Sequence, residues 1–108
     1  MKTLLAGFII GALSASTCLA ADIAAGEQKA KQICAACHGL DGNSQVPDYP
    51  KLGGQYPDYL AKALRDYKSG LRKNPIMAGM AAPLTPQDIE NVAAYYAAQP
   101  AVIYNARK

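Results

Sequence analysis

Two of the three cysteines and the only histidine of this chain stand in one five-residue string, Cys34-Ala35-Ala36-Cys37-His38. Two thiols three positions apart lie about one helical turn apart, so each can add to a vinyl group on one edge of a haem. The next residue, His38, then lies under the ring, where an imidazole nitrogen can reach the iron. This string is the attachment pattern of c-type haem, and it predicts one covalently bound haem c per chain.

Other interpretations of the string fit the sequence less well. A thioredoxin-like cysteine pair occurs in a βαβ context, and no strand pattern is visible in this sequence. A closed zinc site needs four ligands, whereas Cys34, Cys37 and His38 supply three that stand too close together. A plain disulfide would leave the histidine and the long loops unexplained.

The first twenty residues have the layout of a secretory signal peptide. Lys2 gives a positive start, an apolar run follows over 4–13, and small residues lead to Ala20. The run is too short to span a bilayer, which needs about 20 apolar residues. We expect cleavage near Ala20, export to the periplasm, and a single domain over residues 21–108 without an integral membrane segment. An uncleaved anchor and a lipidated Cys18 are the alternatives.

The apolar pattern predicts an all-α domain with three main helices and long loops. Helical spacing covers 22–36, 57–69 and a segment that starts at Thr85 and ends before Pro100, and the stretches 38–55 and 71–84 carry many breakers. The chain has one Phe and no Trp, so bulky core residues are few. We therefore expect the loops to wrap a cofactor that forms part of the core.

Composition also excludes several classes of function. No Lys/Arg run exceeds two residues, which gives nucleic-acid binding little support. Three cysteines cannot form a four-cysteine iron–sulfur site. The chain has neither a second histidine nor a carboxylate pair for acid–base catalysis, so we expect no enzyme activity.

Further motifs accompany the haem string. They are Gly39 beside the string, Asp41-Gly42-Asn43-Ser44, Pro50-Lys51-Leu52-Gly53-Gly54-Gln55, Asn74-Pro75-Ile76-Met77, and Pro83-Leu84 to Tyr96. The order and spacing of these motifs over residues 22–99 resemble those of the class I c-type cytochromes. The closest likeness is to small single-haem bacterial cytochromes c and to the haem modules of bacterial two-haem cytochromes c. The resemblance implies the cytochrome c fold.

The sixth iron ligand is expected to be a methionine. No second histidine exists, which leaves the sulfur atoms of Met77 and Met80, and His/Met ligation raises the reduction potential of the iron. The resemblance implies Met77, seven residues before Leu84, with Met80 packing on the haem edge. It also implies that Pro50, twelve residues after His38, accepts a hydrogen bond from the imidazole.

Two more roles are expected, the first of them from the resemblance. Gly26 and Tyr95 match the crossing of the first and last helices in that family, with Tyr96 as the alternative partner. Arg72 and the hydroxyls of Tyr49, Tyr56 and Tyr67 are candidates to bind the haem propionates; a solvated charge and half-buried rings are the alternative.

The expected function is that of a periplasmic, monomeric carrier of one electron on a His/Met-ligated haem, as in a respiratory chain. It would dock transiently with redox proteins through a small interface. The alternative is an electron-entry cytochrome subunit of a larger oxidoreductase complex. A third hypothesis, an enzyme or gas sensor with an open iron site, requires that neither methionine binds the iron.

Overall fold

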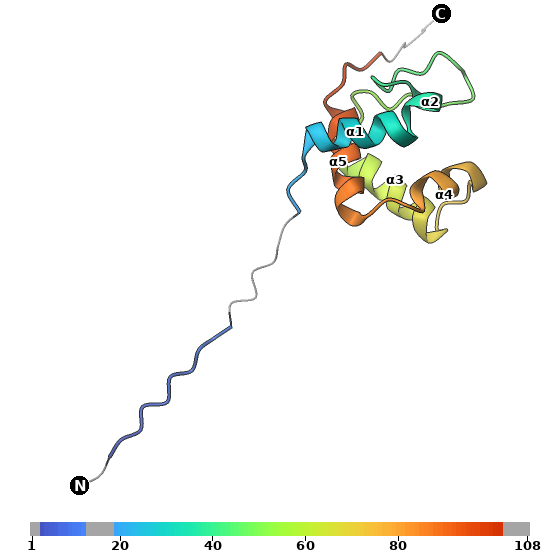
Figure 1. Cartoon of the computed structure of the whole chain (residues 1–108). Coiled ribbons are helices and arrows are strands. Elements are labelled where there is room, and N and C mark those ends of the chain that lie inside the picture. Colours follow the sequence, from blue (N-terminus) through green and yellow to red (C-terminus); the bar gives the residue numbers. More distant parts are fainter. Residues whose placement is uncertain (1–2, 13–18, 103–108) are drawn as a thin grey trace, which may run out of the picture.

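The computed structural model describes residues 3–12 and 19–102. Within these ranges the chain forms five helices and no strand: α1 (Ile23–Ile33), α2 (Ala35–His38), α3 (Pro57–Ser69), α4 (Pro75–Ala81) and α5 (Pro86–Ala97) (Figure 1). The all-α prediction is confirmed. The three main helices are α1, α3 and α5, with 11, 13 and 12 residues.

The segment before the helices is exposed. Residues 3–12 run away from the helical body without secondary structure (Figure 1). In the described part of the chain, no helix is long and apolar enough to cross a membrane. Cys18 lies outside the described residues, and the signal peptide over 1–20 stays a prediction.

The two terminal helices of the body cross each other. The Asp22 carboxylate caps α1 by accepting a hydrogen bond from the Ala25 N–H at 3.0 Å. The Asp22 N–H donates to the side-chain oxygen of Asn91 on α5 at 2.8 Å. A Cβ atom on Gly26 would lie 3.0 Å from the Tyr95 Cβ, which confirms the expected pairing of Gly26 with Tyr95 rather than Tyr96.

Two helix boundaries differ from the sequence prediction. The helix expected over 22–36 ends at Ile33, and a separate turn, α2, runs to His38. The stretch 71–84, expected to be irregular, contains α4. The Asn74 side chain accepts hydrogen bonds from the N–H groups of Ile76 and Met77 at 3.0 Å, and Pro75 occupies the first turn. A capping asparagine followed by proline starts a helix, so Pro75 is not a breaker here.

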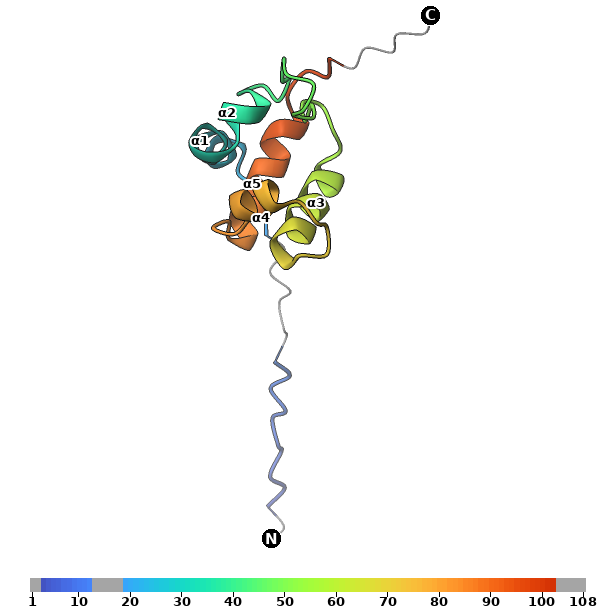
Figure 2. The same ribbon diagram turned by 90° about the vertical axis from the view of Figure 1, so that its right-hand side faces the viewer.

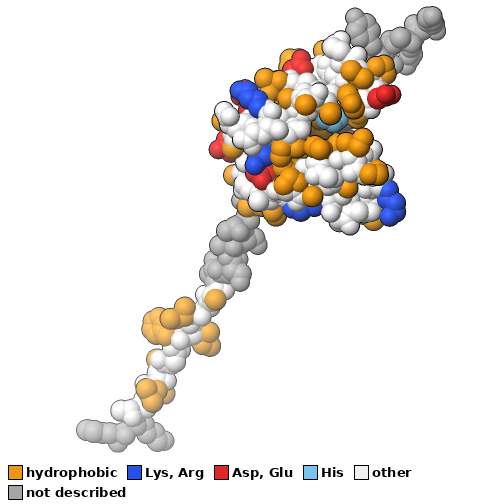
Figure 3. Space-filling view, turned by 45° about the vertical axis from the view of Figure 1, so that its right-hand side comes forward, with side chains coloured by type: hydrophobic (Ala, Val, Ile, Leu, Met, Phe, Trp, Pro, Cys, Tyr) orange, Lys and Arg blue, Asp and Glu red, His pale blue; other side chains and the backbone are white. Residues whose placement is uncertain are grey.

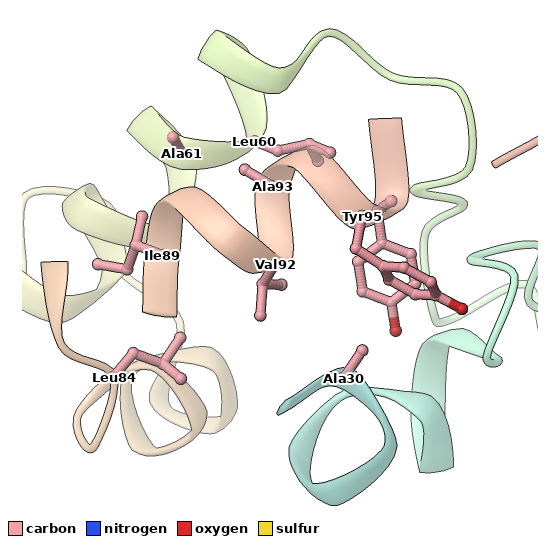
Figure 4. Close-up of a cluster of buried hydrophobic side chains, with 9 residues drawn as sticks. Ala30, Leu60, Ala61, Leu84, Ile89, Val92, Ala93 and Tyr95 are labelled. Atoms are coloured by element: carbon pink, nitrogen blue, oxygen red, sulfur yellow. The ribbon is translucent and has the colours of Figure 1, made fainter. Parts of the chain in front are cut away.

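The core lies around α5. It consists of aliphatic side chains and two tyrosines from α1, α3, α5 and the turn before α5, namely Ala30, Leu60, Ala61, Leu84, Ile89, Val92, Ala93, Tyr95 and Tyr96 (Figure 4). Within the described residues, 39–56 have no helix or strand. The Gly42 carbonyl ties this loop to itself by accepting from the N–H groups of Leu52 and Gly53 at 2.7 and 3.1 Å. The long loop expected around a cofactor is therefore present.

Candidate functional site

A cavity of about 340 Å³ opens between the α2 side and the α4 side of the molecule. Figure 1 shows α2 and α4 well apart on the same side of the helical body, α2 above and α4 below, and residues of both helices line the cavity. In the turned view of Figure 2, α2 again lies above α4. Figure 3 shows the hollow in the surface, with the histidine at its base and apolar side chains around it. Its volume falls within the range of about 300–1,000 Å³ that is typical of cofactor sites.

The haem string forms one wall of this cavity. The Cys34 carbonyl accepts a hydrogen bond from the His38 N–H at 3.0 Å, so one helical turn brings these residues together. Cys34, Cys37 and His38 all line the cavity, and both cysteines are free thiols. Burial raises the pKa of the Cys34 thiol to about 11, so this thiol is protonated at neutral pH.

The rival interpretations of the string find no support in this geometry. The described residues contain no strand of the kind that a thioredoxin-like pair requires. Among the same residues, no group of three or more His, Cys, Asp or Glu side chains is arranged to hold a metal ion. Cys34 and Cys37 are not joined to each other.

The imidazole of His38 is held from one side. Its Nδ1 atom lies 2.8 Å from the Pro50 carbonyl oxygen, which can only accept, so Nδ1 carries the proton and donates. The expected hydrogen bond between these residues is present. It leaves Nε2 as the ring nitrogen that is available to a metal, and His38 is 7% exposed.

Both candidate methionines lie on α4. They are three residues apart, hence on one face of the helix, and both line the cavity. Met77 is half-buried, whereas Met80 is 42% exposed. A thioether sulfur can therefore approach from the side of the cavity opposite His38.

The polar rim differs in part from the sequence prediction. Arg72, Tyr49 and Tyr67 line the cavity, and the Arg72 guanidinium carbon lies 4.8 Å from the centre of the Tyr67 ring. Tyr56 does not belong to the lining and is 79% exposed, so its side chain points to solvent. The proposal of Tyr56 as a propionate ligand is not supported.

Tyr59 also lines the cavity, although no role was predicted for it from the sequence. It stands four and eight residues before Ala63 and Tyr67 on α3, and all three face the cavity. This spacing along one helix face could have identified it. The Tyr59 hydroxyl is the main cause that raises the pKa of Arg72, which keeps the guanidinium charged.

These residues fit a covalently attached haem. The cavity offers two thiols three positions apart in the chain, one oriented imidazole, the thioether sulfurs of α4, and a cation with phenols at the rim. The walls between these groups are apolar side chains from α1, α3 and α5, such as Ile33, Leu60 and Val92. An apolar ring with charged propionates matches this distribution.

The similarities to known proteins agree with a covalently bound haem. A family model described as "Cytochrome c" matches residues 23–98. The chain is 54% identical over 79 residues to cytochrome c4 of Thiocapsa roseopersicina. This match covers 73% of this chain and 41% of that protein. The chain is also 45% identical over 83 residues to cytochrome c-554(548) of Halomonas halodenitrificans. This match covers 74% of this chain and 99% of that protein.

A solved structure and a further relative extend the comparison. The structure of reduced recombinant cytochrome c4 from Pseudomonas stutzeri matches with a TM-score of 0.70 and 46% identity, over 75% of this chain and 47% of that one. A "thiosulfate dehydrogenase electron acceptor" of Stutzerimonas stutzeri is 40% identical over 77 residues, covering 70% of this chain and 36% of that protein. The chain thus spans about two fifths of the cytochrome c4 that it matches in Thiocapsa roseopersicina.

Proposed function

Because the chain belongs to the cytochrome c family, whose cofactor is covalently bound haem c, we propose that it is a one-electron carrier. One observation carries this proposal: a single cavity joins the Cys34–His38 string, which runs from the N-cap of α2 to its end, with the methionines of α4. When bound, haem c supplies an iron that takes up and releases one electron.

Four residues of this chain hold the cofactor in the proposal. Cys34 and Cys37 would form the two thioether links, His38 would bind the iron through Nε2, and Met77 would supply the second protein ligand of the iron. Pro50 keeps the imidazole oriented and more basic through the bond to Nδ1. Two strong protein ligands would leave little room for ligand motion when the charge of the iron changes, which would keep the reorganisation small.

Two further features of the site tune electron transfer. Arg72, with Tyr67 beside it, places a positive charge at the rim where propionates would lie. The apolar walls exclude water from the ring and so influence the potential. The mouth stays open to the surface, as Figure 3 shows, and a partner can approach the ring edge there.

The setting of the carrier follows from the sequence. We propose export to the periplasm, removal of the signal peptide near Ala20, a monomeric mature protein, and brief docking with redox proteins through a small interface. In this setting the chain passes electrons and converts no substrate of its own.

A permanent subunit of a larger oxidoreductase is the second candidate. The similarity to the thiosulfate dehydrogenase electron acceptor favours it, because that relative is named for receiving electrons from an enzyme. Gentle purification from the native host separates the two candidates. A free monomer supports the carrier, and a stable stoichiometric complex supports the subunit.

The optical spectrum and the intact mass of exported protein test the central proposal. We expect a coloured protein whose mass exceeds that of the processed polypeptide by one haem, with the absorption band of methionine-bound ferric iron near the red edge of the visible spectrum. The double variant Cys34→Ser/Cys37→Ser should lose the covalent haem, whereas the control Cys18→Ser should keep it. Colourless wild-type protein, or a mass equal to the bare polypeptide, would contradict the proposal.

A further inference from the structure

Tyr96 on α5 is bonded to both segments that hold His38. Its hydroxyl donates to the Gly39 carbonyl at 3.1 Å, directly after His38. Its own backbone carbonyl accepts a hydrogen bond from the Gly54 N–H at 3.0 Å, four residues after Pro50. One residue thus connects the segment that carries the imidazole with the segment that carries its hydrogen-bond acceptor.

The ring of Tyr96 is fixed in place. The residue is 1% exposed, and a Cβ atom on Gly42 would lie 2.8 Å from its Cδ1. Gly42 is the residue whose carbonyl ties the loop to Leu52 and Gly53. The ring therefore packs against the point where the two segments meet, and it also lines the cavity.

The hydroxyl of Tyr96 is a permanent donor. Burial raises its pKa far above neutrality, so the phenol keeps its proton throughout the physiological range. Without this hydroxyl, the Gly39 carbonyl would retain only the N–H of Gly42, at 3.2 Å. A peptide that loses a buried hydrogen bond is free to move toward other donors.

We propose that Tyr96 is a positioning residue that sets the hydrogen bond from His38 to Pro50 and, through it, the reduction potential of the bound haem. This inference rests on the proposed function. A ligating imidazole becomes a stronger electron donor when its other N–H is well hydrogen-bonded. A stronger donor favours the oxidised iron and lowers the potential, so a looser His38–Pro50 bond raises it.

Tyr95 provides a matched control. It precedes Tyr96 on the same helix, and its hydroxyl donates to the Leu40 carbonyl, one residue farther from His38. Its backbone carbonyl accepts from the Gln99 side chain at 3.2 Å and makes no bond to the Pro50 segment. Tyr95→Phe therefore removes the same kind of hydroxyl from the same helix, and it leaves the hydrogen bonds of Tyr96 to Gly39 and Gly54 in place.

The experiment compares haem-loaded wild-type protein, Tyr96→Phe and Tyr95→Phe. Two quantities are measured: the reduction potential, and the NMR chemical shift of the His38 Nδ1 proton in the reduced, diamagnetic protein. We expect Tyr96→Phe to shift the potential to more positive values and the proton upfield, because its hydrogen bond weakens. Tyr95→Phe should leave both near the wild-type values although it also lowers stability. An unchanged Tyr96→Phe protein, or equal shifts in both variants, overturns the proposal.

A second substitution covers the case in which Tyr96→Phe fails to load haem. Placing 3-fluorotyrosine at position 96 preserves the shape of the ring and makes the hydroxyl a stronger donor. The potential should then move to more negative values, and an unchanged potential overturns the proposal. Wild-type protein without haem would contradict the proposed function itself, whereas loaded variants with wild-type potentials would contradict only the role of Tyr96.

Discussion

Gly26 of α1 lies against the backbone of Asn91 of α5, so closely that a Cβ atom on Gly26 would be 2.0 Å from the Asn91 carbonyl oxygen. A backbone oxygen cannot rotate away as a side chain can, so the two helices can cross here only with glycine. The Asn91 side chain strengthens the same crossing from the other side by accepting from the Asp22 N–H. The helix that leads into the haem string is thereby fixed on the helix behind the cavity.

Gly26→Ala is expected to destabilise the protein strongly. Overpacking costs about 1–3 kcal/mol, which exceeds the gain in helix propensity of about 1 kcal/mol, and a clash with backbone lies at the upper end. Urea unfolding of the haem-loaded protein measures the change. Gly79→Ala in α4 is the control, since a Cβ atom there meets nothing within 4 Å. Equal stability of the two variants would show that the helices can move apart freely.

Replacing the two methionines of α4 one at a time should have different effects on the absorption band of methionine-bound ferric iron. Met77→Ala should abolish the band of methionine-bound ferric iron and let the reduced protein bind carbon monoxide rapidly. Met80→Ala should keep the band, because Met80 is the more exposed residue and is assigned to packing at the haem edge. Absorption spectroscopy of both variants makes the comparison. The opposite result would move the ligand to Met80, and absence of the band from the wild-type protein would exclude methionine ligation.

Arg72→Gln is expected to lower the reduction potential. A positive charge near the haem disfavours the additional charge of oxidised iron, and its removal relieves this repulsion. Coulomb's law at a solvent-exposed site limits the shift to the order of tens of millivolts. Lys73→Gln removes the same charge from the next residue, which does not line the cavity. Voltammetry of both variants at low salt should give the larger shift for Arg72→Gln, and equal shifts would argue against a specific role at the rim.

Asp88→Asn should make the free energy of unfolding less dependent on pH in the acidic range. The Asp88 carboxylate accepts from the Thr85 N–H at 3.0 Å, and this bond holds its pKa below the ordinary value of about 3.9. Because the folded-state pKa is lowered, the carboxylate stabilises the fold above about pH 4, and this contribution is lost as the pH falls through the folded-state pKa. The variant should be about 1 kcal/mol less stable than wild type at pH 7.

Urea unfolding at neutral pH and near pH 2 tests this dependence. The difference between Asp88→Asn and wild type should shrink at the lower pH, where the native carboxyl is itself protonated. Asp48→Asn removes the same charge from the loop between α2 and α3 and serves as the control. A difference that is constant with pH would show that the charge of Asp88 contributes nothing to the cap.

Local chemistry made several features predictable from the sequence. Asp22 and Thr85 cap their helices through bonds to backbone N–H groups three residues away, and Gly70 ends α3 in the left-handed conformation, with φ of 84°. The haem string was recognisable for the same reason, because the spacing of Cys34, Cys37 and His38 is a local feature of the sequence. The helix at Pro75 was missed although the same local signal, a capping Asn74 before a proline, was present.

The sequence by itself determined the cofactor chemistry and the helix starts, because these depend on residues within one turn of each other. Only the tertiary structure decided that the Tyr56 side chain points to solvent, and that Tyr96 reaches Gly39 across 57 positions. Contacts of this kind form when helices pack, and their direction depends on the crossing at Gly26. No local pattern records where a side chain points once distant helices have met.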